Sequence, residues 1–198
     1  MYCRFYFSIA FFILLAACSE KDKPKEVLVI NIQPFKSIPV ETTMFVLTEL
    51  NKIFPHTNLL PAIDLPVSAY NADRNRYRAD SLINFLNKKT TINHITIGLT
   101  NYDISTTKNA IKDWGVIGLG SCPGKACIVS TFRLSKTETK MQLFKITIHE
   151  LGHTAGLEHC SVKTCFMRDA EGGNPTNEEK EFCPACKQYL KSKGWNLD

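Results

Sequence analysis

The sequence has no dense run of lysine and arginine, no internal repeat and no low-complexity segment. Its basic excess is mild, with a formal net charge of +5 over 198 residues. Nucleic-acid binding needs a concentrated basic surface, so we expect no nucleic-acid partner. After residue 18, no apolar stretch approaches the roughly 20 residues that span a bilayer. The 44% of hydrophobic residues instead suit one soluble globular domain with a core.

The amino terminus differs from the rest of the chain. One positive charge precedes an apolar run at residues 5–17, which is short for a membrane span and typical of a signal peptide. The run ends in Leu-Ala-Ala-Cys, which resembles the bacterial lipobox and implies cleavage before Cys18 and lipidation of that cysteine. An ordinary secretory signal, cut near Ala17, is the alternative.

Residues 18–25 are polar, charged and interrupted by a proline, which predicts a short tether behind the lipidated Cys18. The organisation that follows is a signal peptide at 1–17, a tether at 18–25 and one folded domain at 26–198. We therefore expect a lipid-anchored membrane protein of the bacterial cell envelope that faces outside the cytoplasm.

Strand and helix patterns alternate along the domain, which indicates an α/β fold. Apolar or alternating runs predict strands at 27–32, 59–65, 95–99, 116–119 and 127–134. Apolar residues at helical spacing predict helices at 41–54, 79–86 and 136–155, and a further helix is expected at 187–193. The longest helix has a potential capping box at 135–138 and a glycine, Gly156, where a helix end favours one.

The end of that helix has the residues of a hydrolytic metal site. His149 and His153 are four residues apart, so their rings project from one helix face and can ligate one ion. Gly156 allows a sharp turn that would bring His159 back as a third ligand, and three nitrogens leave one zinc position open for water. Zinc lowers the pKa of that water from about 15.7 towards about 7, and Glu150 is placed to take its proton. The predicted reaction is amide hydrolysis without a covalent enzyme intermediate.

The spacing His-Glu-x-x-His-x-x-Gly-x-x-His, with a methionine downstream, resembles the metzincin signature. Within the metzincins the sequence is similar to the archaemetzincin family, over about residues 27–193. The resemblance is carried by residues 126–134 and 149–160, by Cys165-x-Met167 and by Cys183-x-x-Cys186. It implies a metzincin-like zincin fold, a mixed sheet packed on helices, with Met167 beneath the zinc. The 15 residues between Met167 and Cys183 are slightly fewer than in the family, which distinguishes the loop 168–182.

The resemblance also implies a second, structural zinc bound by four cysteines: Cys160, Cys165, Cys183 and Cys186. Two loops each supply a pair, and a closed Cys₄ site would staple the segment after the active-site helix to the C-terminal helix. Because export favours oxidation, two disulfides are the alternative. For Cys122 and Cys127 we expect a disulfide, with two free thiols as the alternative.

The predicted protein is therefore a monomeric zinc metallopeptidase with two zinc ions and a peptide or protein substrate. By the same resemblance, strand 127–134 would form the edge of the cleft and pair with an extended peptide. The alternatives are a zinc-stabilised binding protein with little turnover and another zinc amide hydrolase. Glu150 favours an enzyme, because a binding module needs no carboxylate beside an open zinc position.

Overall fold

The computed structural model describes residues 27–197, so the predicted signal peptide and tether at residues 1–25 lie outside the described residues. The strands are β1 (Val29–Pro34), β2 (Thr57–Leu59), β3 (Tyr70–Asn71), β4 (Arg76–Arg78), β5 (His94–Thr100), β6 (Ile104–Lys108), β7 (Ile111–Val116), β8 (Gly118–Gly120) and β9 (Ala126–Ser130). The α-helices are α1 (Val40–Ile53), α2 (Ala79–Lys89), α3 (Thr139–Thr154) and α4 (Pro184–Ser192). The described residues also form 3₁₀ helices at Val67–Ala69, Ala72–Arg74 and Pro175–Asn177. None of the helices in this part of the chain is both long and apolar enough to cross a membrane.

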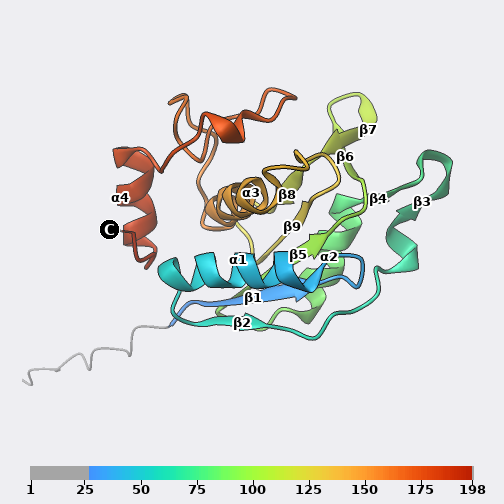
Figure 1. Cartoon of the computed structure of the whole chain (residues 1–198), viewed down its shortest axis with the longest axis horizontal. Helices are drawn as coiled ribbons and strands as arrows, with labels where there is room; N and C mark the ends of the chain where they lie inside the picture. Colours follow the sequence, from blue (N-terminus) through green and yellow to red (C-terminus); the bar gives the residue numbers. More distant parts are fainter. Residues whose placement is uncertain (1–26, 198) are drawn as a thin grey trace, which may run out of the picture.

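The main sheet is mixed and has the order β2-β1-β5-β9-β8. The first four of these strands run parallel, and β8 is antiparallel to β9 at one edge. Side chains alternate along β9: Cys127 and Val129 join the core under α1 and α3, whereas Ala126 and Ile128 join the core under α2. Helices therefore cover both faces of the sheet, as Figure 1 shows, and the predicted α/β class is confirmed.

A second sheet, of order β3-β4-β6-β7, was not predicted. Its strands are short and polar, and charge pairs support it: Asp113 on β7 accepts from Arg74 at 3.0 Å and lies 3.3 Å from Arg76. No apolar alternation marks such strands. The strand predicted at 59–65 is wrong. Pairing in β2 stops at Leu59, and only a single bridge joins Ile63 to Phe35, because the intervening Pro61 has no N–H to donate.

Helix α3 positions the site and differs from its prediction at the amino end. It begins at Thr139 rather than residue 136, and its N-cap, Glu138, makes no side-chain capping bond, so the capping box is absent. At the other end Gly156 has φ +97°, as the predicted turn requires. Strand β9 ends at Ser130, earlier than predicted, because residues 131–134 form a turn closed by Leu134 N–H to Thr131 O.

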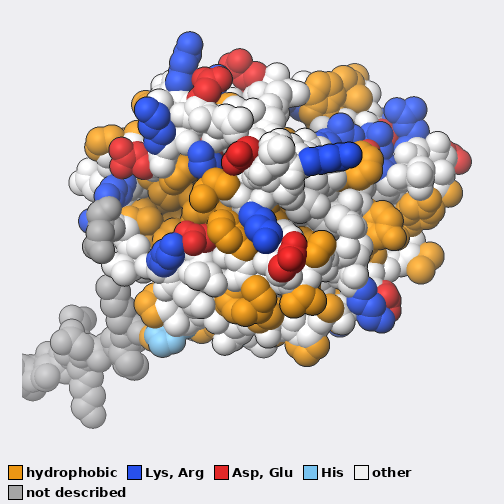
Figure 2. Space-filling view, viewed as in Figure 1, with side chains coloured by type: hydrophobic (Ala, Val, Ile, Leu, Met, Phe, Trp, Pro, Cys, Tyr) orange, Lys and Arg blue, Asp and Glu red, His pale blue; other side chains and the backbone are white. Residues whose placement is uncertain are grey.

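The surface carries both signs of charge. On the face shown in Figure 2, lysine and arginine side chains are interspersed with aspartate and glutamate. Apolar side chains lie between them as scattered groups. On this face the charges therefore form no single-sign field.

Candidate active site

Three histidines converge after the fold brings residue 159 back to the end of α3. His149 and His153 lie one turn apart, and their Nε2 atoms are 3.0 Å apart. His159 faces both, with ring centroids 5.4 Å and 4.9 Å away. One ligand nitrogen from each of the three lies within 4.8 Å of the others. The structure thus brings together the set that the sequence singled out.

Hydrogen bonds on the outer ring nitrogens fix these imidazoles. His149 Nδ1 contacts Phe166 O at 2.6 Å, and His153 Nδ1 contacts Leu157 O at 2.7 Å. Since a carbonyl can only accept, each Nδ1 donates and each Nε2 keeps a free lone pair. Burial lowers the pKa of His149 to about 3, with the neighbouring His153 adding to the effect. Both rings are therefore neutral, which is the form that binds a metal.

Asp169, which the sequence analysis did not single out, lies beside the third histidine. Asp169 Oδ2 lies 3.5 Å from His159 Nδ1. Asp169 is ten residues beyond His159, in the loop after Met167, so only the folded chain pairs them. This contact with the third histidine is longer than the hydrogen bonds that carbonyls accept from the other two.

Glu150 is next to the histidines and buried, with 6% of its surface exposed. Burial raises the pKa of its carboxyl to about 8. Strand β8 passes directly over it: a Cβ built on Gly118 would lie 2.5 Å from Glu150 Oε1, and one on Gly120 would lie 2.8 Å from Glu150 O. Glycine at these two positions therefore makes room for the carboxylate.

A cavity of about 610 Å³ opens over these residues. Strands β7 and β8 line one side, α3 with its histidines lines another, and the loop 168–179 closes the end. Arg133 also lines it and is held by Asp103 through two bonds of 2.8 Å and 2.9 Å. The cavity is large enough for several side chains of a bound peptide.

Beneath the histidines lies Met167, which is fully buried in the core. A Cβ built on Gly152 of α3 would be 2.4 Å from its sulfur, so the methionine packs directly against the helix. This is the floor position that the family resemblance implies for Met167.

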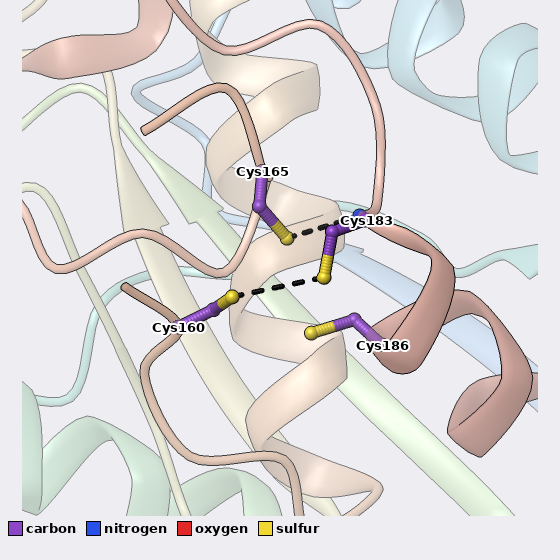
Figure 3. A group of neighbouring side chains, drawn as sticks. All are labelled: Cys160, Cys165, Cys183 and Cys186. Atoms are coloured by element: carbon purple, nitrogen blue, oxygen red, sulfur yellow. Dashed lines mark hydrogen bonds between the residues drawn. The ribbon is translucent and has the colours of Figure 1, made fainter. Parts of the chain in front are cut away.

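The four cysteines form a second cluster, with all four sulfurs within 4.8 Å of one another. Figure 3 shows them converging from the loop after α3 and from the start of α4. Cys160 Sγ and Cys183 Sγ are 3.7 Å apart, and all four are free thiols, so the alternative of two disulfides is not formed. Backbone N–H groups of Met167 and Cys183 donate to Cys165 Sγ at 3.4 Å and 3.3 Å. Burial raises the pKa of the Cys165 thiol, and these two hydrogen bonds act to lower it.

Both donor sets suit zinc. Tetrahedral bonds of about 2.0–2.1 Å to nitrogen place two ligand nitrogens roughly 3.3 Å apart, and bonds of about 2.3 Å to sulfur place two sulfurs roughly 3.8 Å apart. The Nε2 atoms of His149 and His153 are 3.0 Å apart and the sulfurs of Cys160 and Cys183 are 3.7 Å apart, which is close to these values. Three imidazoles leave a coordination position open, whereas four thiolates close the shell.

The disulfide expected between Cys122 and Cys127 is not formed. Both are free thiols, Cys127 fully buried on β9 and Cys122 exposed. The Cys122 Sγ contacts Leu157 O at 3.4 Å instead. The buried side of a central strand leaves Cys127 no access to the loop that carries Cys122.

A family model for peptidase family M54 matches residues 27–192. The archaemetzincin of Archaeoglobus fulgidus is 30% identical over 167 residues, which cover 82% of this chain and 98% of that protein. The archaemetzincin of Methanocaldococcus jannaschii is 28% identical over 175 residues, which cover 83% of this chain and 94% of that protein. The crystal structure of the former, complexed with malonate, superposes with a TM-score of 0.70 at 29% identity and covers 82% of this chain and 99% of that one. The archaemetzincin structure from Methanopyrus kandleri has the same fold, with a TM-score of 0.71 at 23% identity. The match covers 87% of this chain and 98% of that one.

Proposed function

Since this chain belongs to peptidase family M54, the archaemetzincin zinc metallopeptidases, we propose that it hydrolyses peptide bonds with Glu150 as the base that activates the attacking water. The observation that carries this proposal is the position of Glu150. It is the buried carboxylate beside three converging histidines, at the wall of the cavity.

His149, His153 and His159 would hold the catalytic zinc through the nitrogens that face one another. Zinc bound there supplies a Lewis acid that polarises a carbonyl and acidifies water. The carbonyls of Phe166 and Leu157 keep two of the rings in the tautomer that binds metal.

Glu150 would take a proton from the attacking water and pass it to the leaving amine. Burial raises the pKa of its carboxyl, and a positive ion held by the three histidines would favour the ionised form that accepts the proton. The close approach of Gly118 holds the carboxylate at one place beside the histidines. A larger residue at 118 would displace it.

The substrate would pair with the sheet through β8 rather than β9. Strand β9 lies between β5 and β8, so it has no free edge, and the expectation that it borders the cleft is corrected. Strand β8 is the edge of the main sheet and lines the cavity, and no further strand of the described residues pairs with its outer side. An extended peptide could add there by backbone hydrogen bonds, which recognise little of the sequence.

We also propose a structural zinc held by Cys160, Cys165, Cys183 and Cys186. Its ligands come from the loop after α3 and from α4, so the ion would join these segments. The converging sulfurs and the N–H donors to Cys165 support this. On the sequence pattern alone, we also propose that the protein is a monomer with a lipid anchor at Cys18. The anchor would hold it in the bacterial cell envelope, facing outside the cytoplasm.

The test compares Glu150→Gln with wild-type protein and with Glu181→Gln, a matched control on an exposed glutamate. Metal analysis and a peptide-library digest are run on all three. Glu150→Gln should keep its zinc and lose hydrolysis by about 10²–10⁴-fold, the range for a removed general base, while Glu181→Gln cleaves like wild type. Equal rates for Glu150→Gln and wild type would refute the mechanism. Zinc-loaded wild-type protein that cleaves no peptide would favour the binding-protein alternative.

A further inference from the structure

The cavity extends past the histidines to a part that the proposed chemistry does not use. Residues 174–176 and Glu179 line it, from the loop that follows Met167. Lys145 ties this loop to α3, because its Nζ donates to Thr176 O and Glu179 O at 2.6 Å each. Lys145 precedes His149 by four residues, so this region lies about 6 Å along the helix axis from the first ligand.

Glu179 is a buried acid whose carboxylate has no hydrogen-bond partner in the described part of the chain. It is 4% exposed and is one of the residues that line the cavity. Within residues 27–197 its carboxylate makes no hydrogen bond or ion pair, since the bond from Lys145 goes to its backbone oxygen. Burial raises the pKa of this carboxyl to about 7, although Lys145 and Arg168 act to lower it. Leaving such a group unpaired is costly, and a ligand that supplies the missing donor removes the cost.

The cations near this end of the cavity are already engaged. Arg133 is paired with Asp103, and Arg168 is paired with Glu178 at 2.7 Å. The ammonium group of Lys145 donates to two backbone carbonyls. These cations therefore leave the Glu179 carboxylate open to a donor from a bound molecule.

We propose that Glu179 makes this end of the cavity a binding site for the cationic side chain of a lysine or arginine in the substrate. The inference rests on the proposed peptidase function, because a peptide bound along β8 would be the molecule that places such a side chain here. A long side chain can bury its methylene stem against the apolar Ile146 and bring its charged end to the carboxylate. The charge-assisted hydrogen bond formed in this buried setting would set the preference.

Two probes test the proposal by binding, without turnover. They are peptide hydroxamates that are identical except for one lysine, replaced in the second by norleucine, with the pair made for each position along the peptide. Calorimetry measures both on zinc-loaded wild type, Glu179→Gln and Glu181→Gln. At one position wild type and Glu181→Gln should bind the lysine probe about tenfold or more tightly than the norleucine probe, as a charged hydrogen bond provides. Glu179→Gln should lose that preference and bind the norleucine probe as wild type does.

The proposal is overturned if wild type shows no lysine preference at any position, or if Glu179→Gln retains the preference. The first comparison needs no variant, so it decides the question even if Glu179→Gln does not fold. Failure of the proposed function is a separate result. Wild-type protein that cleaves no peptide but still prefers the lysine probe would refute peptidase activity and leave the Glu179 site supported.

Discussion

Helix α3 and the methionine beneath it should be tightly coupled at Gly152. An added methyl group at this position would lie 2.4 Å from Met167 Sδ and 3.1 Å from its Cε. Met167 is fully buried, so its side chain cannot swing into solvent to make room. Alanine improves helix propensity by about 1 kcal/mol over glycine, but overpacking costs about 1–3 kcal/mol. We expect Gly152→Ala to lower the free energy of unfolding by up to about 2 kcal/mol.

A double-mutant cycle isolates the cause. Met167→Ala removes the sulfur and should cost about 2–5 kcal/mol by itself. In that background Gly152→Ala meets no clash and should stabilise the protein by about 1 kcal/mol, so the coupling is about 1–3 kcal/mol. Chemical denaturation measures this, with free zinc held constant because a bound ligand shifts apparent stability.

Gly173→Ala provides the control, since Gly173 is exposed and its added Cβ would meet only Ala170 O at an ordinary 3.4 Å. It should change stability equally in both backgrounds, by about 0.5 kcal/mol or less. If Gly152→Ala is stabilising by the same amount with and without Met167, the packing of the methionine against α3 is not as described.

Three further predictions concern the metal sites and the buried acid. Asp169→Ala removes the outer contact of His159 and should weaken zinc binding about 10–100-fold in a chelator competition; unchanged affinity would show that the 3.5 Å contact does not orient the ring. Cys183→Ser should lower bound zinc by about one ion per chain in metal analysis, and full retention would count against the structural zinc. Burial raises the pKa of Glu179 in the folded state from its ordinary value of 4.5 to about 7, so the folded state holds its proton more tightly. That contribution to the free energy of unfolding is complete below about pH 4.5 and is lost as the pH rises through 7. Glu179→Gln should therefore remove this pH-dependent loss of stability. The same pH profile of stability in the variant and in wild type would contradict the buried setting.

The candidate site was predictable because most of its residues are local in sequence. A spacing of four places His149 and His153 on one helix face, and Gly156 at φ +97° gives the turn that returns His159. Both follow from backbone geometry that any helix with a glycine end obeys. The strand and helix cores, β1, α1, α2 and β5, were likewise marked by apolar periodicity.

The rest depends on contacts between distant segments. The second sheet is supported by pairs such as Arg74 with Asp113, and its short, polar strands have no apolar alternation. The single strand predicted at 116–119 is divided in the structure, where β7 ends at Val116 and the three-residue β8 begins at Gly118 at the edge of the main sheet. Asp169 and Glu179 lie in a loop without periodicity, and only folding places one beside His159 and the other in the cavity.

The adjacency of His159 and Cys160 links the two proposed metal sites through one peptide bond. The segment between Cys160 and Met167 is closed on itself, because Cys160 N–H donates to Met167 O at 2.7 Å. The same segment presents Phe166 O to His149 Nδ1, so it contacts the catalytic histidines at two points. A zinc held by the four cysteines would fix this segment and, with it, the position of His159 and the tautomer of His149. The closed site would thus act on catalysis by orienting the open one, which explains why a cysteine follows the third histidine directly.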